Sequence, residues 1–189
     1  MRSFMLALGL VAASCSAAET PSYQLISGSV PFDKGPDGNS IILDARDGLI
    51  VVDTGRHPEH SAKILAGARK WGRRVAVIVN THWHLDHTTG NLDIREVYPR
   101  AAVYGTNAVD GALATYLKQG RDSANKALAD PKTSPQDRAR ILRRRYRVDH
   151  PETLRPTQPV LGSARMQVAG RDLDVRVAPF AATEADLWT

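Results

Sequence analysis

The stretch THWHLDH at residues 81–87 holds three of the chain's six histidines, with an aspartate directly before the last one. In an extended segment, side chains two residues apart point to the same side, so His82 and His84 can approach one ion together. Asp86 and His87 are adjacent and can face a neighbouring position. Imidazole and carboxylate are zinc ligands that require no thiolate. We therefore predict a site for one or two Zn²⁺ ions at His82, His84, Asp86 and His87.

Such a site suits catalysis better than a structural role. Structural zinc sites normally have four protein ligands, often cysteines, and the only cysteine is Cys15. A catalytic zinc lowers the pKa of a bound water and holds it for attack on a carbonyl or phosphoryl centre. The remaining histidines show no comparable pattern. His57 and His60 follow the tripeptide DTG at a helix start and His150 precedes a proline, so we expect all three at the surface.

The elements around the motif predict an α/β fold. The segment RVAVIVN at 74–80 predicts a buried strand that ends at the histidines. Similar runs predict strands at 22–30, 39–45, 49–55 and 101–106, with a hairpin turn at 46–48 and a helix over 58–71. In sheets whose strands alternate with helices, site residues gather at the carboxyl ends of the strands. The motif has this position.

A helical stretch separates these strands from those of the tail. Residues 107–130 and 135–148 predict two helices, and we interpret about 107–148 as an insertion over or beside the metal site. The arginine-rich segment 138–147 supplies much of the net charge of +5. We interpret it as the solvated face of a helix that turns Ile141 and Leu142 inward. The tail predicts strands at 164–170, 171–179 and 186–188.

The first 18 residues predict a signal peptide. Arg2 supplies positive charge, the apolar run FMLALGLVAA is too short to span a bilayer, and Ser16 and Ala18 suit cleavage after residue 18. Cys15 leaves lipidation open as a minority alternative. We expect a periplasmic or secreted protein with one domain over 19–189 and no transmembrane segment. Clustered arginines can contact phosphates, but an exported protein rarely meets nucleic acid, so we expect no such partner.

The motif and its surroundings resemble the metallo-β-lactamase superfamily. The family pattern His-x-His-x-Asp-His is matched in full at 82–87, and the tripeptide at 53–55, Asp-Thr-Gly, resembles the end of a family strand. The segment TTGNL at 88–92 is similar to the one that follows the family motif. The resemblance implies an αββα sandwich of α/β (α+β) class. It also implies a zinc-dependent hydrolase of a small-molecule ester, thioester, lactam or phosphoester-type bond.

The resemblance also assigns roles to residues. His82 and His84 correspond to ligands of a first zinc, and Asp86 and His87 to ligands of a second. Asp86 would also orient the attacking hydroxide, which makes it the catalytic candidate. Asp53 corresponds to an aspartate that supports the metal loop from behind.

Two departures from the family pattern limit these expectations. Ala182 stands where the family has a third histidine ligand, and Glu184 is two residues away from that position. Further family ligands lie beyond the counterpart of Thr189, so we expect a C-terminally truncated sandwich with an incomplete second half. Neither zinc would then have three protein ligands, and a full dinuclear site is not expected. The alternatives are a truncated or degenerate non-catalytic member with partial metal binding, and self-association through the incomplete core.

Overall fold

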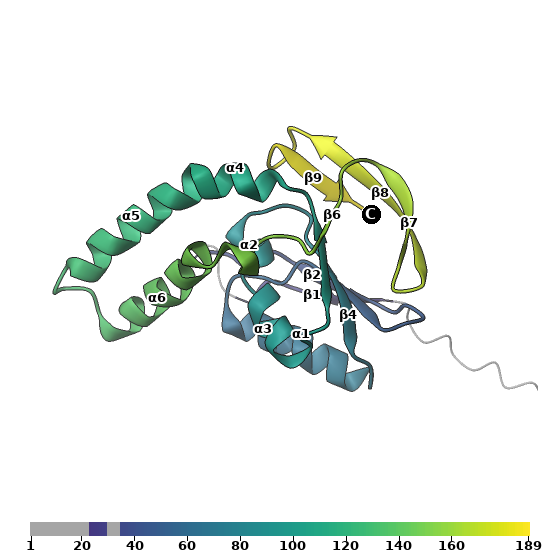
Figure 1. The fold of residues 1–189 in the computed structure, drawn as a ribbon. Helices are drawn as coiled ribbons and strands as arrows, with labels where there is room; N and C mark the ends of the chain where they lie inside the picture. Colours follow the sequence, from purple (N-terminus) through teal and green to yellow (C-terminus); the bar gives the residue numbers. More distant parts are fainter. Residues whose placement is uncertain (1–22, 30–34) are drawn as a thin grey trace, which may run out of the picture.

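A six-stranded mixed sheet forms the centre of the molecule in the computed structural model, which describes residues 23–29 and 35–189 (Figure 1). Its strands follow chain order: β1 (Tyr23–Ile26), β2 (Ser40–Leu43), β3 (Leu49–Val52), β4 (Val75–Val79), β5 (Ala102–Gly105) and β6 (Gln158–Pro159). β1, β2 and β3 pair antiparallel, and β3 to β6 pair parallel. The hairpin expected at 46–48 is confirmed. The predicted signal peptide lies outside the described residues.

Helices α1 (Pro58–Lys70) and α3 (Asn91–Val97) cover one face of this sheet. α1 begins at a proline, whose fixed φ suits the first helical turn. Ile64 of α1 and Ile94 of α3 are fully buried and belong to one core cluster with Ile42, Val51 and Ile78 of the sheet. Burying each such side chain contributes roughly 1.5–3 kcal/mol. This core holds β3 and β4, and therefore the residues at their ends, in fixed register.

A small antiparallel sheet packs on the other face. It consists of β7 (Ala164–Val168), β8 (Arg171–Pro179) and β9 (Ala185–Trp188). Val175 and Leu187 share a second core cluster with Ile50, Val77 and Val79 of the large sheet. The layers are thus helix, sheet and sheet, and no helix within the described ranges contributes to this second cluster. The mixed α/β class is confirmed, and the two sheets face one another as expected.

Three helices project from the body as a helical arm, residues 108–149 (Figure 1). They are α4 (Ala108–Ala114), α5 (Tyr116–Ala129) and α6 (Pro135–Asp149), followed by a 3₁₀ turn, η2 (Pro151–Thr153). The Ser134 side chain accepts a hydrogen bond from the backbone of Asp137 and caps α6. Leu117 of α5 packs in a third cluster with Leu85 of the short helix α2 (Leu85–Thr88). The arm therefore rests on the histidine motif.

The expectation for the arginine-rich segment was wrong in one respect. Arg147 is 2% exposed, whereas Leu142 is 48% exposed. The Arg147 guanidinium donates to the carbonyl of Thr89 at 2.7 Å and to Asp93 of α3 at 3.1 Å. A buried charge with such partners can replace apolar packing, so α6 docks through an arginine. None of the helices among residues 23–29 and 35–189 has the length and apolarity to cross a bilayer.

Candidate metal centre

The parallel pairing of β3 and β4 places two chemically important segments side by side. Val52 lies opposite Val79, so Asp53 and Asn80 emerge at the same edge of the sheet. Asp53 has a left-handed φ of 56° and is 4% exposed. Its carboxylate accepts hydrogen bonds from the Thr81 backbone N–H at 2.8 Å and from the Thr81 hydroxyl at 2.7 Å. These bonds offset the backbone strain, which is on the order of 1 kcal/mol, and fix the start of the histidine loop, residues 81–88.

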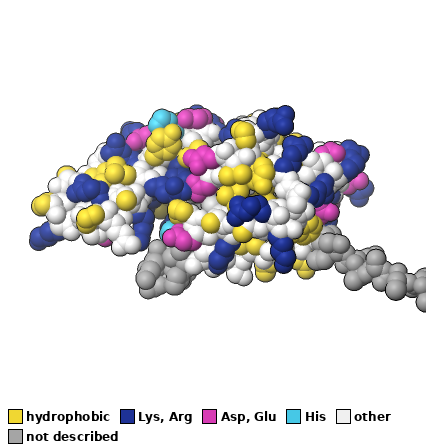
Figure 2. Space-filling view, turned by 90° about the horizontal axis from the view of Figure 1, so that it is seen from below, with side chains coloured by type: hydrophobic (Ala, Val, Ile, Leu, Met, Phe, Trp, Pro, Cys, Tyr) yellow, Lys and Arg dark blue, Asp and Glu magenta, His cyan; other side chains and the backbone are white. Residues whose placement is uncertain are grey.

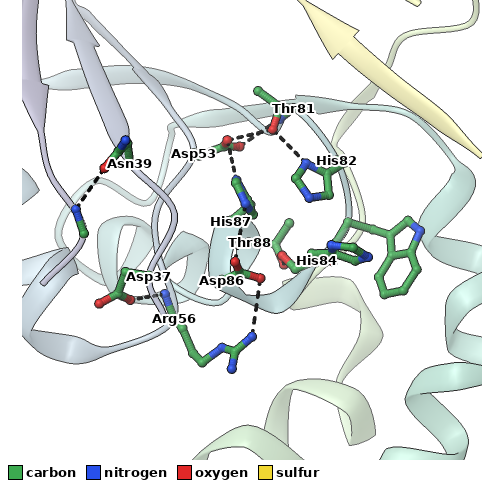
Figure 3. A network of polar contacts seen from close by, with 12 residues as sticks. Asp37, Asn39, Asp53, Arg56, Thr81, His82, His84, Asp86, His87 and Thr88 are labelled. Atoms are coloured by element: carbon green, nitrogen blue, oxygen red, sulfur yellow. Dashed lines mark hydrogen bonds and ion pairs between the residues drawn. The ribbon is translucent and has the colours of Figure 1, made fainter. Parts of the chain in front are cut away.

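His87 is held by Asp53 from the opposite side (Figure 3). Its Nδ1 lies 2.7 Å from Oδ2 of Asp53, so the carboxylate fixes the ring with the proton on Nδ1 and leaves Nε2 as the available ligand atom. Burial lowers the pKa of His87, but the hydrogen bond to Asp53 and the negative charges of Asp53, Asp86 and Asp186 together outweigh it, and the pKa is raised above its usual value. A Cβ at Gly38 would lie 2.6 Å from Cε1 of His87, so only glycine leaves room for this ring.

The three imidazoles of the histidine loop lie together (Figure 3). The ring centroids of His82 and His87 are 4.0 Å apart, and those of His82 and His84 are 4.7 Å apart. Burial, then repulsion by His87 and His84, lowers the pKa of His82, which favours the neutral form that binds metals. The donors and the carboxylate behind His87 therefore fit zinc in type. Among the described residues, no three His, Cys, Asp or Glu side chains complete one metal shell.

Asp86 points toward the same group of side chains and is fixed by neighbours outside the motif. Its Oδ2 lies 3.5 Å from Nε2 of His87, and its Oδ1 accepts from the Arg56 guanidinium at 3.3 Å. The backbone N–H of Arg56 in turn donates to the buried carboxylate of Asp37 at 2.7 Å. Sequence reasoning missed Arg56 and Asp37, because each lies in a separate loop and no spacing links them to the histidines.

Asp37 is a structural anion rather than a ligand. Burial raises its pKa, but hydrogen bonds from the backbones of His57 and Arg56 outweigh this effect, and the pKa lies below its ordinary value. Asp37 also lies 3.2 Å from Nδ1 of His57. Asp37 thus holds the segment after Asp53 in place, including the start of α1.

A buried amide and hydroxyl network fixes the far end of the histidine loop. The carbonyl of His87 accepts from Thr54 N–H at 2.8 Å and from the Asn80 side chain at 3.1 Å. Asn91 donates to Asn80 at 2.7 Å and accepts from the Thr54 hydroxyl at 2.9 Å. Their partners are all satisfied, so the network is rigid. Thr54 and Asn91 lie in the segments 53–55 and 88–92, which carried the family resemblance, but the resemblance assigned no role to either residue.

The loop between β8 and β9 lies against the histidine loop. The Leu187 N–H donates to the carbonyl of Thr81 at 2.6 Å, and Asp186 accepts from the backbone of Ala182 at 2.9 Å. Ala182 is exposed and offers no side-chain donor atom, as the sequence indicated. Glu184 approaches the site, but its Oε2 accepts from Nε1 of Trp83 at 3.1 Å. Glu184 therefore lies beside the motif, where its carboxylate is hydrogen-bonded to Trp83.

The remaining histidines do not all lie at the surface. His60 is fully buried, and its ring nitrogens lie 2.8 Å from the Ser40 hydroxyl and 3.2 Å from the Ser29 hydroxyl. Gly55, with φ of 75°, has no Cβ to collide with this ring. The expectation for His60 was wrong, because two hydroxyls satisfy both nitrogens. His57 is partly buried beside Asp37, and His150 is half-exposed beside Glu152.

Comparison with known proteins adds independent evidence. The family description "Metallo-beta-lactamase superfamily" matches residues 34–164. A hydroxyacylglutathione hydrolase of Synechococcus sp. (strain JA-3-3Ab) is 40% identical over 63 residues, which cover 33% of this chain and 23% of that protein. A linear primary-alkylsulfatase of Pseudomonas sp. (strain ATCC 19151) is 44% identical over 50 residues, which cover 26% of this chain and 10% of the relative. The matches thus span less than a quarter of these relatives.

Solved structures support the same fold. A metallo-beta-lactamase family protein from Thermus thermophilus superimposes with a TM-score of 0.58 at 19% identity, covering 90% of this chain and 56% of that protein. At this identity the likeness concerns the fold alone. It agrees with the helix, sheet and sheet layers.

Proposed function

The chain belongs to the metallo-β-lactamase superfamily, and from this membership and the site geometry we propose that it is a zinc-dependent hydrolase of a small molecule. The observation that carries the proposal is the convergence of three imidazoles, one of which is fixed through Nδ1 by Asp53. Such a carboxylate behind a histidine is typical of metal ligands. His82 and His84 would hold one ion, and Asp86 and His87 a second.

When bound, zinc lowers the pKa of a water molecule and polarises the bond under attack. The chain's own residues supply orientation and charge. Asp86 accepts a hydrogen bond from the attacking water and directs its lone pair to the substrate. Arg56 fixes one oxygen of Asp86 through a hydrogen bond of 3.3 Å and so orients that carboxylate. Asp53 keeps the Nδ1 proton of His87 in place.

Named relatives narrow the bond class within this proposal. One is a hydroxyacylglutathione hydrolase and another an alkylsulfatase, so their names denote a thioester and a sulfate ester. A thioester or another activated ester is the substrate class we favour. The site of this chain lies at an open edge of the sheet beside the helical arm, which leaves room for a small molecule.

One observation favours a second candidate, a non-catalytic member that retains partial metal binding. Ala182 brings no ligand, and the described residues complete no shell of three. A chain of this kind binds zinc weakly and turns over no ester. The Ala182→His variant distinguishes the candidates, because the added imidazole would restore a ligand beside the histidine loop.

The test combines zinc content with hydrolysis of S-lactoylglutathione, a thioester. We expect the unmodified chain to retain zinc after gel filtration and to release thiol, and His84→Ala to lose most of both. His150→Ala is the matched control, because it removes one imidazole outside the loop. Zinc retention without thiol release, with turnover appearing only in Ala182→His, would establish the second candidate. Absence of zinc from every variant would overturn both.

A further inference from the structure

A cavity of about 440 Å³ opens beside the histidine loop and continues between α5 and α6. Its wall includes Trp83, His84 and Asp86 from the loop, and Tyr116 and Val148 from the helical arm. The volume is within the range of small-molecule sites. The space that a substrate of the candidate metal centre would occupy is thus shaped by the arm.

The charge of this wall is strongly one-sided. Among the described residues that line the cavity, Asp86 is the one carboxylate, against four guanidinium groups: Arg56, Arg121, Arg144 and Arg145. Arg56 pairs with Asp86, while Arg121 and Arg145 lie 3.6 and 3.0 Å from Asp149. Figure 2 shows such Lys and Arg side chains, in dark blue, among yellow apolar ones over the arm.

Two groups in the lining have unused donors. The Arg144 guanidinium makes no hydrogen bond or ion pair with any residue of 23–29 or 35–189. The Nε of Arg56 is buried and has no acceptor in the same part of the chain. A buried donor without an acceptor is unfavourable, so a ligand that supplies an oxygen atom to Nε of Arg56 gains affinity.

Four of the six arginines of α6 divide into two sets by helical spacing. Arg143 and Arg147, four residues apart, both reach Asp93 of α3 and anchor the helix. Arg144 and Arg145 lie on another side, toward α5 and the cavity. Arg144 is exposed to solvent and also lines the cavity, beside Leu117 and Val148, so its guanidinium can reach a ligand bound there.

We propose that the substrate of this site is an anion with an apolar portion, and that its carboxylate or a similar oxyanion binds Arg144 and Arg56. The planar guanidinium suits bidentate contact with a carboxylate. The apolar portion would pack on Tyr116, Leu117 and Val148, with the scissile bond at His84 and Asp86. The inference rests on the proposed function only for the bond that is cleaved, because anion binding requires no metal.

The first experiment measures binding alone. Isothermal titration calorimetry of the metal-free chain compares 4-phenylbutyrate with the uncharged 4-phenylbutanamide, which has nearly the same shape. We expect the anion to bind at least about tenfold more tightly, since a hydrogen bond to a charged group contributes about twice a neutral one. Arg144→Gln should bring the two dissociation constants within about twofold of each other.

The control is Arg165→Gln, which removes the same charge from an exposed position on β7 of the small sheet. It should leave the preference for the anion unchanged. Equal binding of the two ligands by the unmodified chain would overturn the inference, and so would an equal loss of preference in both variants, which would indicate net charge alone.

The second experiment uses the zinc-loaded chain and two esters, mono-4-nitrophenyl succinate and 4-nitrophenyl acetate. We expect the ratio of their kcat/KM values to favour the anionic ester and to fall about tenfold in Arg144→Gln, through KM. An unchanged ratio in that variant would contradict the inference. Absence of hydrolysis of either ester would count against the proposed function, while the calorimetric result would still decide the anion site.

Discussion

His60 shows how one buried residue links the start of α1 to the histidine loop. Its ring is enclosed by Ser29, Ser40 and Gly55, two residues beyond Asp53. Burial lowers the pKa of His60 more than the nearby carboxylate of Asp37 raises it. The ring is therefore neutral in the folded chain at a pH where it is charged after unfolding.

This pKa shift gives a prediction for stability. Below the usual histidine pKa of about 6.5 the unfolded chain binds more protons than the folded chain, so the free energy of unfolding falls as pH falls. We expect His60→Gln to reduce this slope between pH 7.5 and 5.5, by at most about 1.4 kcal/mol per pH unit. Urea unfolding at several pH values measures it. Parallel slopes for the two proteins would show that His60 does not titrate on unfolding.

At the scale of elements, the docking of α6 depends on one buried ion pair. Arg147 is 2% exposed and binds both Asp93 and the carbonyl of Thr89. Asp93 also pairs with Arg143 at 2.5 Å. The two partners are therefore not equivalent. Asp93 pairs with two cations, Arg143 and Arg147, whereas Arg147 pairs with one carboxylate among the described residues, that of Asp93.

We therefore expect that substitutions of Asp93 and of Arg147 lower the free energy of unfolding by different amounts. Asp93→Ala leaves a buried guanidinium without its counter-charge and should lower the free energy of unfolding by about 3–5 kcal/mol. Arg147→Met keeps a long side chain, removes the buried charge and should cost less. Urea unfolding of both variants makes the comparison. A larger loss in Arg147→Met would mean that its contact with Thr89 dominates.

The elements show what the sequence could and could not predict. Apolar periodicity placed the core strands, α1 and α6 within a few residues, because burial imposes those patterns. The single helix predicted over 107–130 is instead two helices, α4 and α5, which are separated at Thr115. The clustering of the three imidazoles also followed from spacing, because two-residue alternation and a turn act locally. Arg56, Asp37 and Arg147 could not be predicted. Their partners are 19 to 58 residues away, and only folding brings them together.

At the scale of the whole molecule, three parts of the structure meet at the candidate metal centre. The large sheet supplies Asp53 and the histidine loop, the small sheet contributes the loop that contains Ala182, and the arm closes the arginine-lined cavity. Each part reaches the site through a hydrogen bond or an apolar contact with residues 81–88. Metal binding should therefore stabilise the entire chain and not the loop alone.

This coupling predicts a zinc-dependent melting temperature. Zinc at a hundred times its dissociation constant should add about 2.7 kcal/mol, or roughly 5–11 °C for a chain of this size. Asp53→Asn places an amide donor against the Nδ1 proton of His87 and should weaken zinc binding about 10–100-fold. At the same zinc concentration, the stabilisation should fall to about 0.4–1.4 kcal/mol.

Differential scanning fluorimetry with and without zinc provides the measurement. The matched control is Asp172→Asn, on an exposed position of β8, where the carboxylate contacts Gln167. Because that residue is remote from the histidine loop, its zinc-induced shift should equal that of the unmodified chain. Equal shifts in all three proteins would show that zinc binds elsewhere, and the roles assigned to His87 and Asp53 would then be wrong. Removal of zinc with a chelator should return the unmodified chain to its lower melting temperature, since the stabilisation exists only while the ion is bound.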